Sequence, residues 1–128
     1  MIYELGILGA GNMAEAIARG VLTASVFTPN QIIASDVSEA RRELFSSALG
    51  IHAIVSSDDV ARQSKVILLS VKPQQMADVL AGLGRVMDER TLVISIAAGI
   101  SASFIETNLG HGKPWRVIRT MPNTPMLV

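Results

Sequence analysis

Hydrophobic residues occur along the chain in two alternating patterns. Short continuous apolar runs, such as the one ending at Leu8, are typical of strands that are buried on both faces. Between these runs, apolar residues recur at helical spacing, as Met13, Ile17 and Val21 do. The pattern predicts strands at 3–8, 31–35, 51–55, 65–71, 91–96 and 115–120, and helices at 12–24, 38–49, 58–63, from Pro73 past Leu83, and at 101–109.

Several polar residues mark the expected ends of these elements. Gly50 is placed to cap the C-terminus of the second helix, and Ser56 or Ser57 to cap the N-terminus of the third. Ser103 and Glu106 have the spacing of a capping box, while the stretch 28–30 reads as a loop.

The alternation of strands and helices over short connections predicts an α/β fold, a Rossmann-type doubly wound parallel sheet of about six strands. Right-handed crossovers favour the strand order 3-2-1-4-5-6. Ligands of such sheets lie outside the carboxyl ends of the strands. The turns expected to be functional are Gly9–Met13, Ser35–Asp36, Lys72–Pro73, Ala97–Gly99 and Met121–Pro125.

The first of these turns carries the pattern Gly9-x-Gly11-x-x-Ala14, directly after a predicted strand and at the start of a predicted helix. This is the setting in which the pattern binds dinucleotides. Gly9 permits a sharp turn where a side chain would clash, and Gly11 leaves room for a pyrophosphate. Ala14 allows close packing of helix on strand. The free N–H groups and the positive dipole end of the helix then face the phosphates.

Composition narrows the class of protein. The chain has 128 residues, as many acidic as basic side chains, and no cysteine. These values indicate one domain over residues 1–128, with no nucleic-acid surface, disulfide or thiolate metal site. His52 and His111 have no partner at metal-ligand spacing. The first apolar run is short and carries Glu4, so it is neither a signal peptide nor a membrane span. We expect a cytoplasmic protein without metal.

Four segments together resemble a known family. They are Gly-Ala-Gly-Asn-Met-Ala at 9–14, Val71-Lys72-Pro73, Ser95-Ile96-Ala97-Ala98-Gly99, and Arg119-Thr120-Met121-Pro122-Asn123-Thr124-Pro125. They closely resemble pyrroline-5-carboxylate reductases, in the order and at the spacings of that family. The resemblance implies reduction of 1-pyrroline-5-carboxylate to L-proline by hydride transfer from NAD(P)H. The alternatives are a related imine or keto-acid reductase of the same superfamily and a non-catalytic nucleotide-binding module.

The resemblance also implies roles for individual residues. Gly9, Gly11, Asn12 and Met13 would hold the pyrophosphate, and Ser70, Val71, Lys72 and Pro73 would line the ribose and nicotinamide. Ala97, Ala98 and Gly99 would wall the nicotinamide pocket, and Ser57 stands where the family often has a cofactor-binding Asn. No catalytic side chain is expected in these 128 residues, because hydride transfer to an imine depends mostly on the positioning of the nicotinamide and the imine carbon. Lys72 and Asn123 would only support the reaction.

The end of the second predicted strand bears on the choice of cofactor. Asp36 is placed to bind the adenosine ribose 2′-hydroxyl and to repel a 2′-phosphate, which favours NAD(H). Ser35, Arg41 and Arg42 could instead hold that phosphate. Because members of the family often use NADPH, the balance favours NADP(H), with NAD(H) as the alternative.

The chain departs from the family in its length. Family members have a second, all-helical domain that forms the dimer and binds the substrate, and this chain ends at Val128. We therefore expect a dinucleotide-binding domain truncated just before that helical domain. Such a fragment would bind the cofactor without reducing the imine, and would expose an apolar surface where helices are missing. The full-length protein is expected to be a homo-oligomer with a small-molecule substrate.

Overall fold

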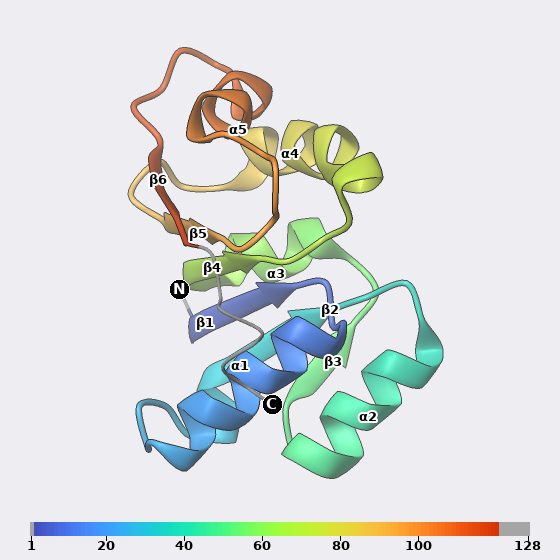
Figure 1. Ribbon diagram of the computed structural model, residues 1–128. Coiled ribbons are helices and arrows are strands. Elements are labelled where there is room, and N and C mark those ends of the chain that lie inside the picture. Colours follow the sequence, from blue (N-terminus) through green and yellow to red (C-terminus); the bar gives the residue numbers. More distant parts are fainter. Residues whose placement is uncertain (1, 121–128) are drawn as a thin grey trace.

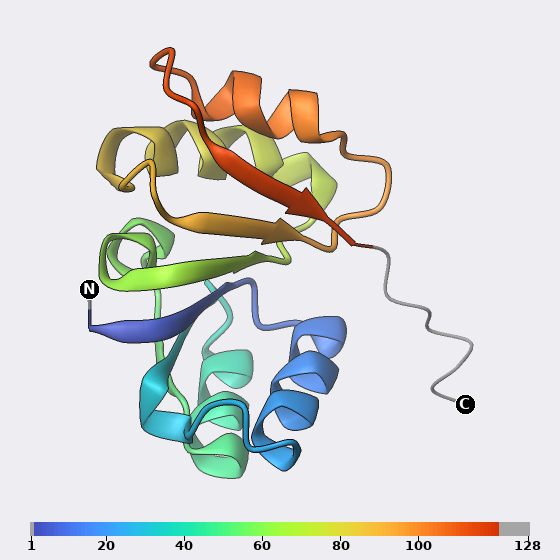
Figure 2. The same cartoon turned by 90° about the vertical axis from the view of Figure 1, so that its left-hand side faces the viewer.

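The computed structural model describes residues 2–120, which form one parallel sheet between two layers of helices (Figures 1 and 2). The elements are β1 (Tyr3–Leu8), α1 (Asn12–Thr23), the 3₁₀ helix η1 (Pro29–Gln31), β2 (Ile32–Ser35), α2 (Glu39–Leu49), β3 (His52–Ile54), α3 (Ser57–Gln63), β4 (Ser64–Leu69), α4 (Pro73–Val86), β5 (Leu92–Ser95), α5 (Ala102–Leu109) and β6 (Arg116–Arg119).

The sheet has six strands in the order β3-β2-β1-β4-β5-β6. All five neighbouring pairs are parallel. The α/β class and the strand order predicted from the sequence are therefore confirmed. The order reverses between β1 and β4, so the turns that follow these two strands lie side by side at the carboxyl edge of the sheet.

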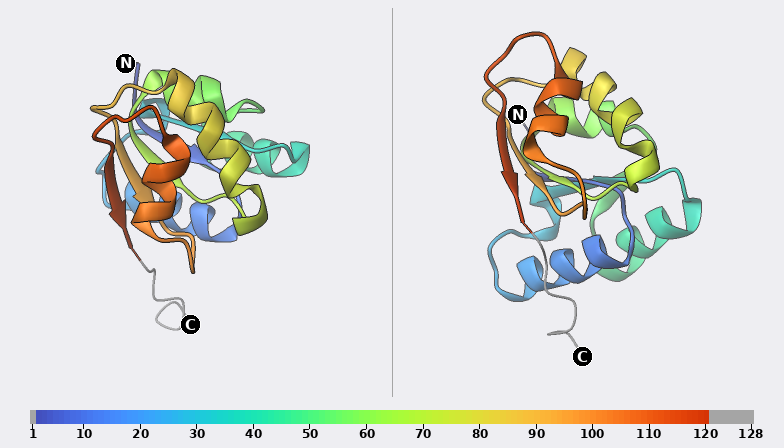
Figure 3. Two further views of the ribbon diagram at one scale, coloured as in Figure 1. Left: turned by 90° about the horizontal axis from the view of Figure 1, so that it is seen from above. Right: turned by 45° about the horizontal axis from the view of Figure 1, so that its top comes forward.

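The helices divide between the two faces according to the direction of the crossovers. On one face, α1 and α2 pack over β1 and β2, around a core in which Ile7, Ile32 and Phe45 are fully buried. On the other face, α3, α4 and α5 cover a core that extends from Ile33 of β2 to Val93 of β5. Figure 3 shows these two layers from further directions.

Residues 2–120 cover only half of the sheet face that carries α1 and α2. Beside α1, an apolar groove opens over β4 and β5, and Ile118 of β6 is 51% exposed. The groove is lined by Leu5, Ile17, Val21, Phe27, Val66, Leu68, Leu92, Ile94, Ile96 and Thr120. The groove is apolar, as the sequence leads us to expect, and its cover by helices of a longer protein stays a prediction. Within residues 2–120, no helix is both long and apolar enough to cross a membrane.

Local details of the sequence prediction need two corrections. The stretch predicted as a loop at 28–30 contributes to a 3₁₀ helix, because Thr28 and Gln31 form a reciprocal capping box at its start. The capping box proposed for Ser103 and Glu106 does not form. Helix α5 begins one residue after Ser101, whose hydroxyl accepts the N–H of Phe104 at 3.0 Å. The caps predicted at Gly50 and at the Ser56–Ser57 pair are confirmed, the latter by Ser56.

Candidate functional site: a dinucleotide groove at the carboxyl edge

The glycine-rich turn leaves β1 through a backbone conformation that favours glycine. Gly9 has φ +95°, and a Cβ atom placed there would lie 2.6 Å from the carbonyl oxygen of Ser70. That oxygen belongs to the backbone after β4, so it cannot move aside as a flexible side chain could. The tight turn predicted for Gly9 is confirmed, and it depends on the close approach of the β1 and β4 turns.

Beyond Gly9, the loop presents a row of free backbone amides. The N–H of Gly9 donates to the carbonyl of Ser35 at 2.9 Å, and helix bonding begins only with Glu15 donating to the carbonyl of Gly11. Within residues 2–120, no hydrogen bond is made by the N–H groups of Gly11, Asn12 and Met13. A Cβ atom built on Gly11 would have nothing within 4 Å. An anion could therefore approach these amides at the N-terminus of α1.

Asp36 follows β2 and reaches back to the glycine-rich loop. Its Oδ2 atom accepts the N–H of Ala10 at 2.8 Å, and its Oδ1 atom accepts the N–H of Ser38 at 2.8 Å. Each carboxylate oxygen retains a further lone pair, because an ionised carboxylate can accept about four hydrogen bonds. Asp36 thus holds the backbone of this loop, and it can also accept a hydrogen bond from a hydroxyl group.

The two arginines of α2 are held in different places. Arg41 donates from Nε to the carbonyl oxygen of Ala10, and from Nη2 to Oε1 of Glu15 at 2.8 Å. Arg42 donates from Nη1 to the carbonyl oxygens of Asp36 and Val37, at 2.9 and 3.0 Å. Hydrogen bonds from Arg41 and then Arg19 lower the pKa of the Glu15 carboxyl below its ordinary value of 4.5. Glu15 is therefore ionised at neutral pH, and it forms an ion pair with the guanidinium of Arg41.

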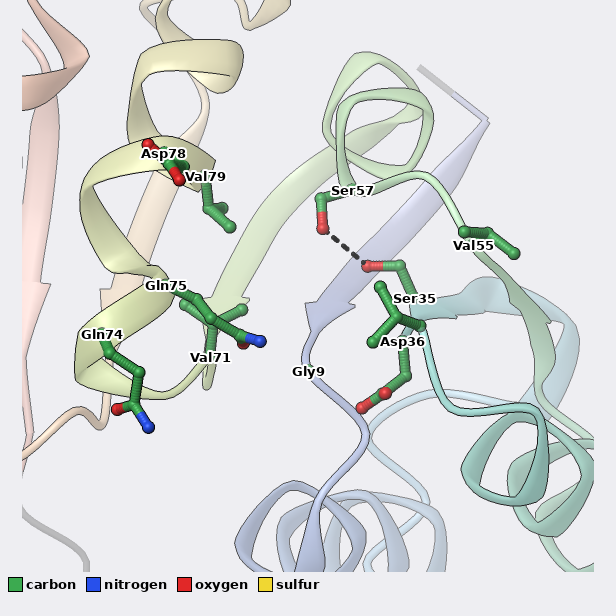
Figure 4. A pocket seen from close by; sticks show the side chains of 11 residues that line it. Gly9, Ser35, Asp36, Val55, Ser57, Val71, Gln74, Gln75, Asp78 and Val79 are labelled. Atoms are coloured by element: carbon green, nitrogen blue, oxygen red, sulfur yellow. Dashed lines mark hydrogen bonds between the residues drawn. The ribbon is translucent and has the colours of Figure 1, made fainter.

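A pocket of about 280 Å³ opens between the end of β2 and the first turns of α4. Its lining consists of Gly9, Ser35, Asp36, Val37, Val55, Ser57, Val71, Gln74, Gln75, Asp78 and Val79. Figure 4 shows the hydroxyls of Ser35 and Ser57 facing each other on one wall, and the amide of Gln75 directed across the gap from α4. The two serine oxygens are 3.2 Å apart, and Ser35 is buried.

This pocket unites some of the predicted cofactor residues and leaves others outside its lining. Gly9, Ser35, Asp36, Ser57 and Val71 come from four separate turns and line it together. The remainder lie along the same carboxyl edge, but outside this pocket: Gly11, Asn12, Met13, Ser70, Lys72, Pro73, Ala97, Ala98 and Gly99. Asn123 lies outside the described residues.

Sequence reasoning missed the apolar and polar residues that complete the pocket walls. Val37 lies two residues after the end of β2 and Val55 directly follows β3, and the two are 77% and 57% exposed. Valines placed at or just after the ends of predicted strands, at the ligand-binding edge of the sheet, could have indicated a pocket wall. On α4, Gln75 and Val79 are four residues apart, so they share one helix face. No motif distinguishes that face from an ordinary solvent-exposed one.

The turns after β4 and β5 lie at the same carboxyl edge and have fewer side chains held by hydrogen bonds. Lys72 is exposed and occupies the N-cap position of α4 without a side-chain capping bond, and α4 begins at Pro73 as predicted. Ser95, which is buried, accepts the N–H of Ala97 with its hydroxyl at 3.3 Å. Among residues 2–120, no group of three or more His, Cys, Asp or Glu side chains could hold a metal ion.

A family model described as "NADP oxidoreductase coenzyme F420-dependent" matches residues 4–99. The chain belongs to this family. The match covers the glycine-rich loop, both walls of the pocket and the turn after β5. Membership in this oxidoreductase family agrees with a dinucleotide groove at the carboxyl edge.

Comparison with curated proteins gives more specific relatives within this family. The chain is 41% identical to the pyrroline-5-carboxylate reductase of Pisum sativum over 126 residues, which cover 98% of this chain and 45% of that protein. It is 35% identical to the Escherichia coli reductase of the same name over 128 residues, 100% of this chain and 47% of that one. The chain therefore spans less than half the length of these relatives.

Solved structures agree with the sequence comparison. A pyrroline-5-carboxylate reductase from Coxiella burnetii superposes with a TM-score of 0.89 at 33% identity, covering 98% of this chain and 46% of that one. The Plasmodium falciparum enzyme with NADP bound gives a TM-score of 0.80 at 26% identity, covering 98% and 44%. A prephenate dehydrogenase from Aquifex aeolicus, at 16% identity, shares the fold alone.

Proposed function

We propose that the carboxyl-edge groove binds a nicotinamide dinucleotide. The observation that carries this proposal is the row of N–H groups of Gly11, Asn12 and Met13, which find no hydrogen-bond acceptor among residues 2–120 and lie beside the open face of Gly11. These groups fit a diphosphate, because three N–H donors and the positive end of a helix meet there with no side chain in front of Gly11.

The two ends of the groove would divide the rest of the cofactor. The pocket that contains Ser35, Asp36 and Ser57 combines valine side chains with hydroxyl, amide and carboxylate groups, which could contact the base and the ribose of an adenosine. The turns at 70–73 and 97–99 would hold the nicotinamide, as the resemblance implies. Lys72 would contribute mainly its backbone and a nearby charge, because its side chain makes no hydrogen bond among residues 2–120.

For the choice of cofactor, NADP(H) remains favoured and NAD(H) the alternative. The Plasmodium falciparum relative has NADP bound, which supports NADP(H) here. The hydrogen bonds of the two arginines on α2 bear on this choice. Arg41 is bonded to the loop and to Glu15, so Arg42 is the cation that we expect to meet a 2′-phosphate, while Asp36 opposes it.

We further infer that the whole protein reduces 1-pyrroline-5-carboxylate to L-proline. The support is the name shared by the relatives at 35–42% identity. A bound nicotinamide in its reduced form would supply the hydride that the cyclic imine carbon accepts. The residues of this chain would orient the two rings and exclude water, and no side chain here needs to act as a nucleophile.

The activity would require more polypeptide than this domain. The relatives are more than twice as long as the matched segment, and residues 2–120 leave the sheet face over β4 and β5 uncovered. We propose that a helical domain of the longer protein covers that face and contributes the substrate site. A homo-oligomer of the longer protein and a cytoplasmic location remain predictions.

Two measurements test this function. Titration of the 128-residue chain with NADPH and NADH, followed by calorimetry, is expected to show binding of one or both in the micromolar to millimolar range (~10⁻⁶ to ~10⁻³ M). The longer gene product is expected to oxidise NADPH when 1-pyrroline-5-carboxylate is added, whereas the 128-residue chain is not. Absence of binding at millimolar dinucleotide would refute the cofactor site. Binding without turnover by the longer protein would point to a nucleotide-binding module.

A further inference from the structure

Ala10 is the one residue of the glycine-rich loop whose backbone is held on both sides by the segment that follows β2. Its N–H donates to Asp36 and its carbonyl oxygen accepts from Arg41. Both bonds are long-range in sequence, with separations of 26 and 31 residues. Ala10 itself is fully buried, and the two hydrogen bonds that the charged side chains make to it are partly buried.

Each bond fixes a different peptide plane. The N–H of Ala10 belongs to the peptide that joins it to Gly9, and its carbonyl belongs to the peptide that joins it to Gly11. In a trans peptide the C=O and N–H groups point in opposite directions. By holding the carbonyl of Ala10 toward α2, Arg41 therefore turns the N–H of Gly11 to the opposite side. That N–H is the first in the row of amides at the start of α1 that find no acceptor within the described part of the chain.

Arg41 is itself fixed from a third element. Glu15, in the first turn of α1, binds Nη2 of Arg41 at 2.8 Å, and only about a quarter of either side chain is exposed, 25% for Arg41 and 22% for Glu15. One guanidinium thus joins α2, the loop and α1. Glycine-containing loops have many accessible conformations, and this bridge selects one of them.

We propose that Asp36 and Arg41 are positioning residues that clamp the peptides around Ala10 and so aim the amide of Gly11 at the diphosphate. This inference rests on the proposed dinucleotide site and deepens it. It assigns Arg41 to the loop and removes it from the set of groups that could bind a 2′-phosphate directly. It also gives Asp36 a function that is independent of whether the cofactor carries that phosphate.

Adjacent arginines on α2 provide a matched pair of variants. Arg41→Met keeps an unbranched apolar stem and removes the guanidinium from Ala10. Arg42→Met removes the same charge one residue further along, where the guanidinium contacts the carbonyls of Asp36 and Val37. Both variants lose a positive charge and a hydrogen bond to a backbone carbonyl, but only the first loses the contact with Ala10.

The probes are ADP, which carries the diphosphate, and adenosine, which does not. Arg41→Met is expected to weaken ADP and NADH binding about tenfold, the scale of one hydrogen bond to a charged group, and to leave adenosine binding unchanged. Arg42→Met is expected to weaken ADP less than about threefold. Equal losses in the two variants, or equal losses of ADP and adenosine, would overturn the clamp.

A second readout needs no ligand. Amide hydrogen exchange of the peptide that contains residues 9–13 is expected to accelerate about tenfold in Arg41→Met and less than about threefold in Arg42→Met, because Arg42 donates to Asp36 and Val37 and not to residues 9–13. Unchanged exchange in Arg41→Met would contradict the clamp. If the unmodified chain binds no dinucleotide and yet this exchange difference is seen, the clamp stands and the proposed function fails.

Discussion

The two halves of the sheet differ in how completely the described residues finish them. In the half made of β1, β2 and β3, helices α1 and α2 cover one face, and α3 packs against β1 and β2 on the other. In the half made of β4, β5 and β6, α4 and α5 cover one face, and the opposite face is an apolar groove. The carboxyl edge repeats this contrast, because Asp36, Arg41 and Arg42 fix the loops of the first half.

From this difference we infer which part of a longer protein would bind the cofactor and which would select the substrate. The half that would bind adenosine and diphosphate is complete in itself, since its charged side chains are bonded to its own loops. The half that would bind nicotinamide has an exposed Lys72 and turns of small residues. Its uncovered face leaves room for polypeptide from elsewhere. Cofactor binding is therefore expected to belong to this domain, and selection of the substrate to the longer protein.

The largest effect is expected where the two halves meet. Gly9→Ala should abolish dinucleotide binding and destabilise the fold by at least about 2 kcal/mol, because a side chain at φ +95° is strained and its Cβ would meet the carbonyl of Ser70. Urea unfolding and calorimetric titration measure the two losses.

Gly20→Ala is the matched control for that substitution. Gly20 lies inside α1, and a Cβ atom there would have nothing within 4 Å. Alanine is expected to stabilise the helix by about 0.5–1 kcal/mol and to leave binding unchanged. Normal NADH binding by Gly9→Ala would show that the loop tolerates another path off β1, and would break the link between the two turns.

Substitutions at two neighbouring residues of β5 compare the stability contributed by the two sheet faces in the half made of β4, β5 and β6. Val93 is fully buried beneath the helices, whereas Ile94 is partly exposed in the groove. Val93→Ala is expected to cost about 1.5–3 kcal/mol in urea unfolding, and Ile94→Ala less than about 1 kcal/mol, although the isoleucine is larger. A larger cost for Ile94→Ala than for Val93→Ala would mean that the apolar groove over β4 and β5 is covered in solution. If that cost also depended on protein concentration, the cover would be a second copy of the chain.

The next effect concerns cofactor choice in the more complete half. Asp36→Ser removes the carboxylate that opposes a 2′-phosphate, and it should raise the ratio of NADPH to NADH affinity about tenfold. Both affinities should also fall, because Ala10 loses its acceptor. Asp78→Ser removes a carboxylate from the other wall of the same pocket and should change the ratio less than about twofold. An equal change in both variants would show that overall charge, and not Asp36, sets the preference.

The fold could be predicted closely because its signals are local. Apolar runs of β1 and β4 and the spacing of Met13, Ile17 and Val21 each identify one element, and the handedness of crossovers then leaves one strand order. Turn conformation was predictable at Gly9 and Gly50 for the same reason, since only a residue without Cβ adopts positive φ readily.

The site could be predicted only where a motif marks it. The sequence suggested Arg41 as a phosphate ligand, because nothing in it relates Arg41 to Ala10, 31 positions earlier. Gln75 and Val79 were missed because a polar helix face has no pattern that separates a pocket wall from ordinary surface. Contacts between side chains of separate crossovers depend on the packed structure, and periodicity carries no information about them.

The smallest expected effect is a pH dependence within the first half. Hydrogen bonds from Arg41 and Arg19 lower the pKa of Glu15 below 4.5, so the folded chain holds this carboxylate ionised more strongly than the unfolded chain does. The stabilisation is fully present above pH 4.5 and is lost as the pH falls through the depressed value. Melting temperatures of the unmodified chain and of Glu15→Gln should therefore differ at pH 7 and converge below pH 4.5. Glu43→Gln, an exposed residue of α2, should show no such convergence. A gap between the unmodified chain and Glu15→Gln that stays constant with pH would mean that Glu15 acts through packing, and that the bridge to Arg41 contributes no charge to the clamp.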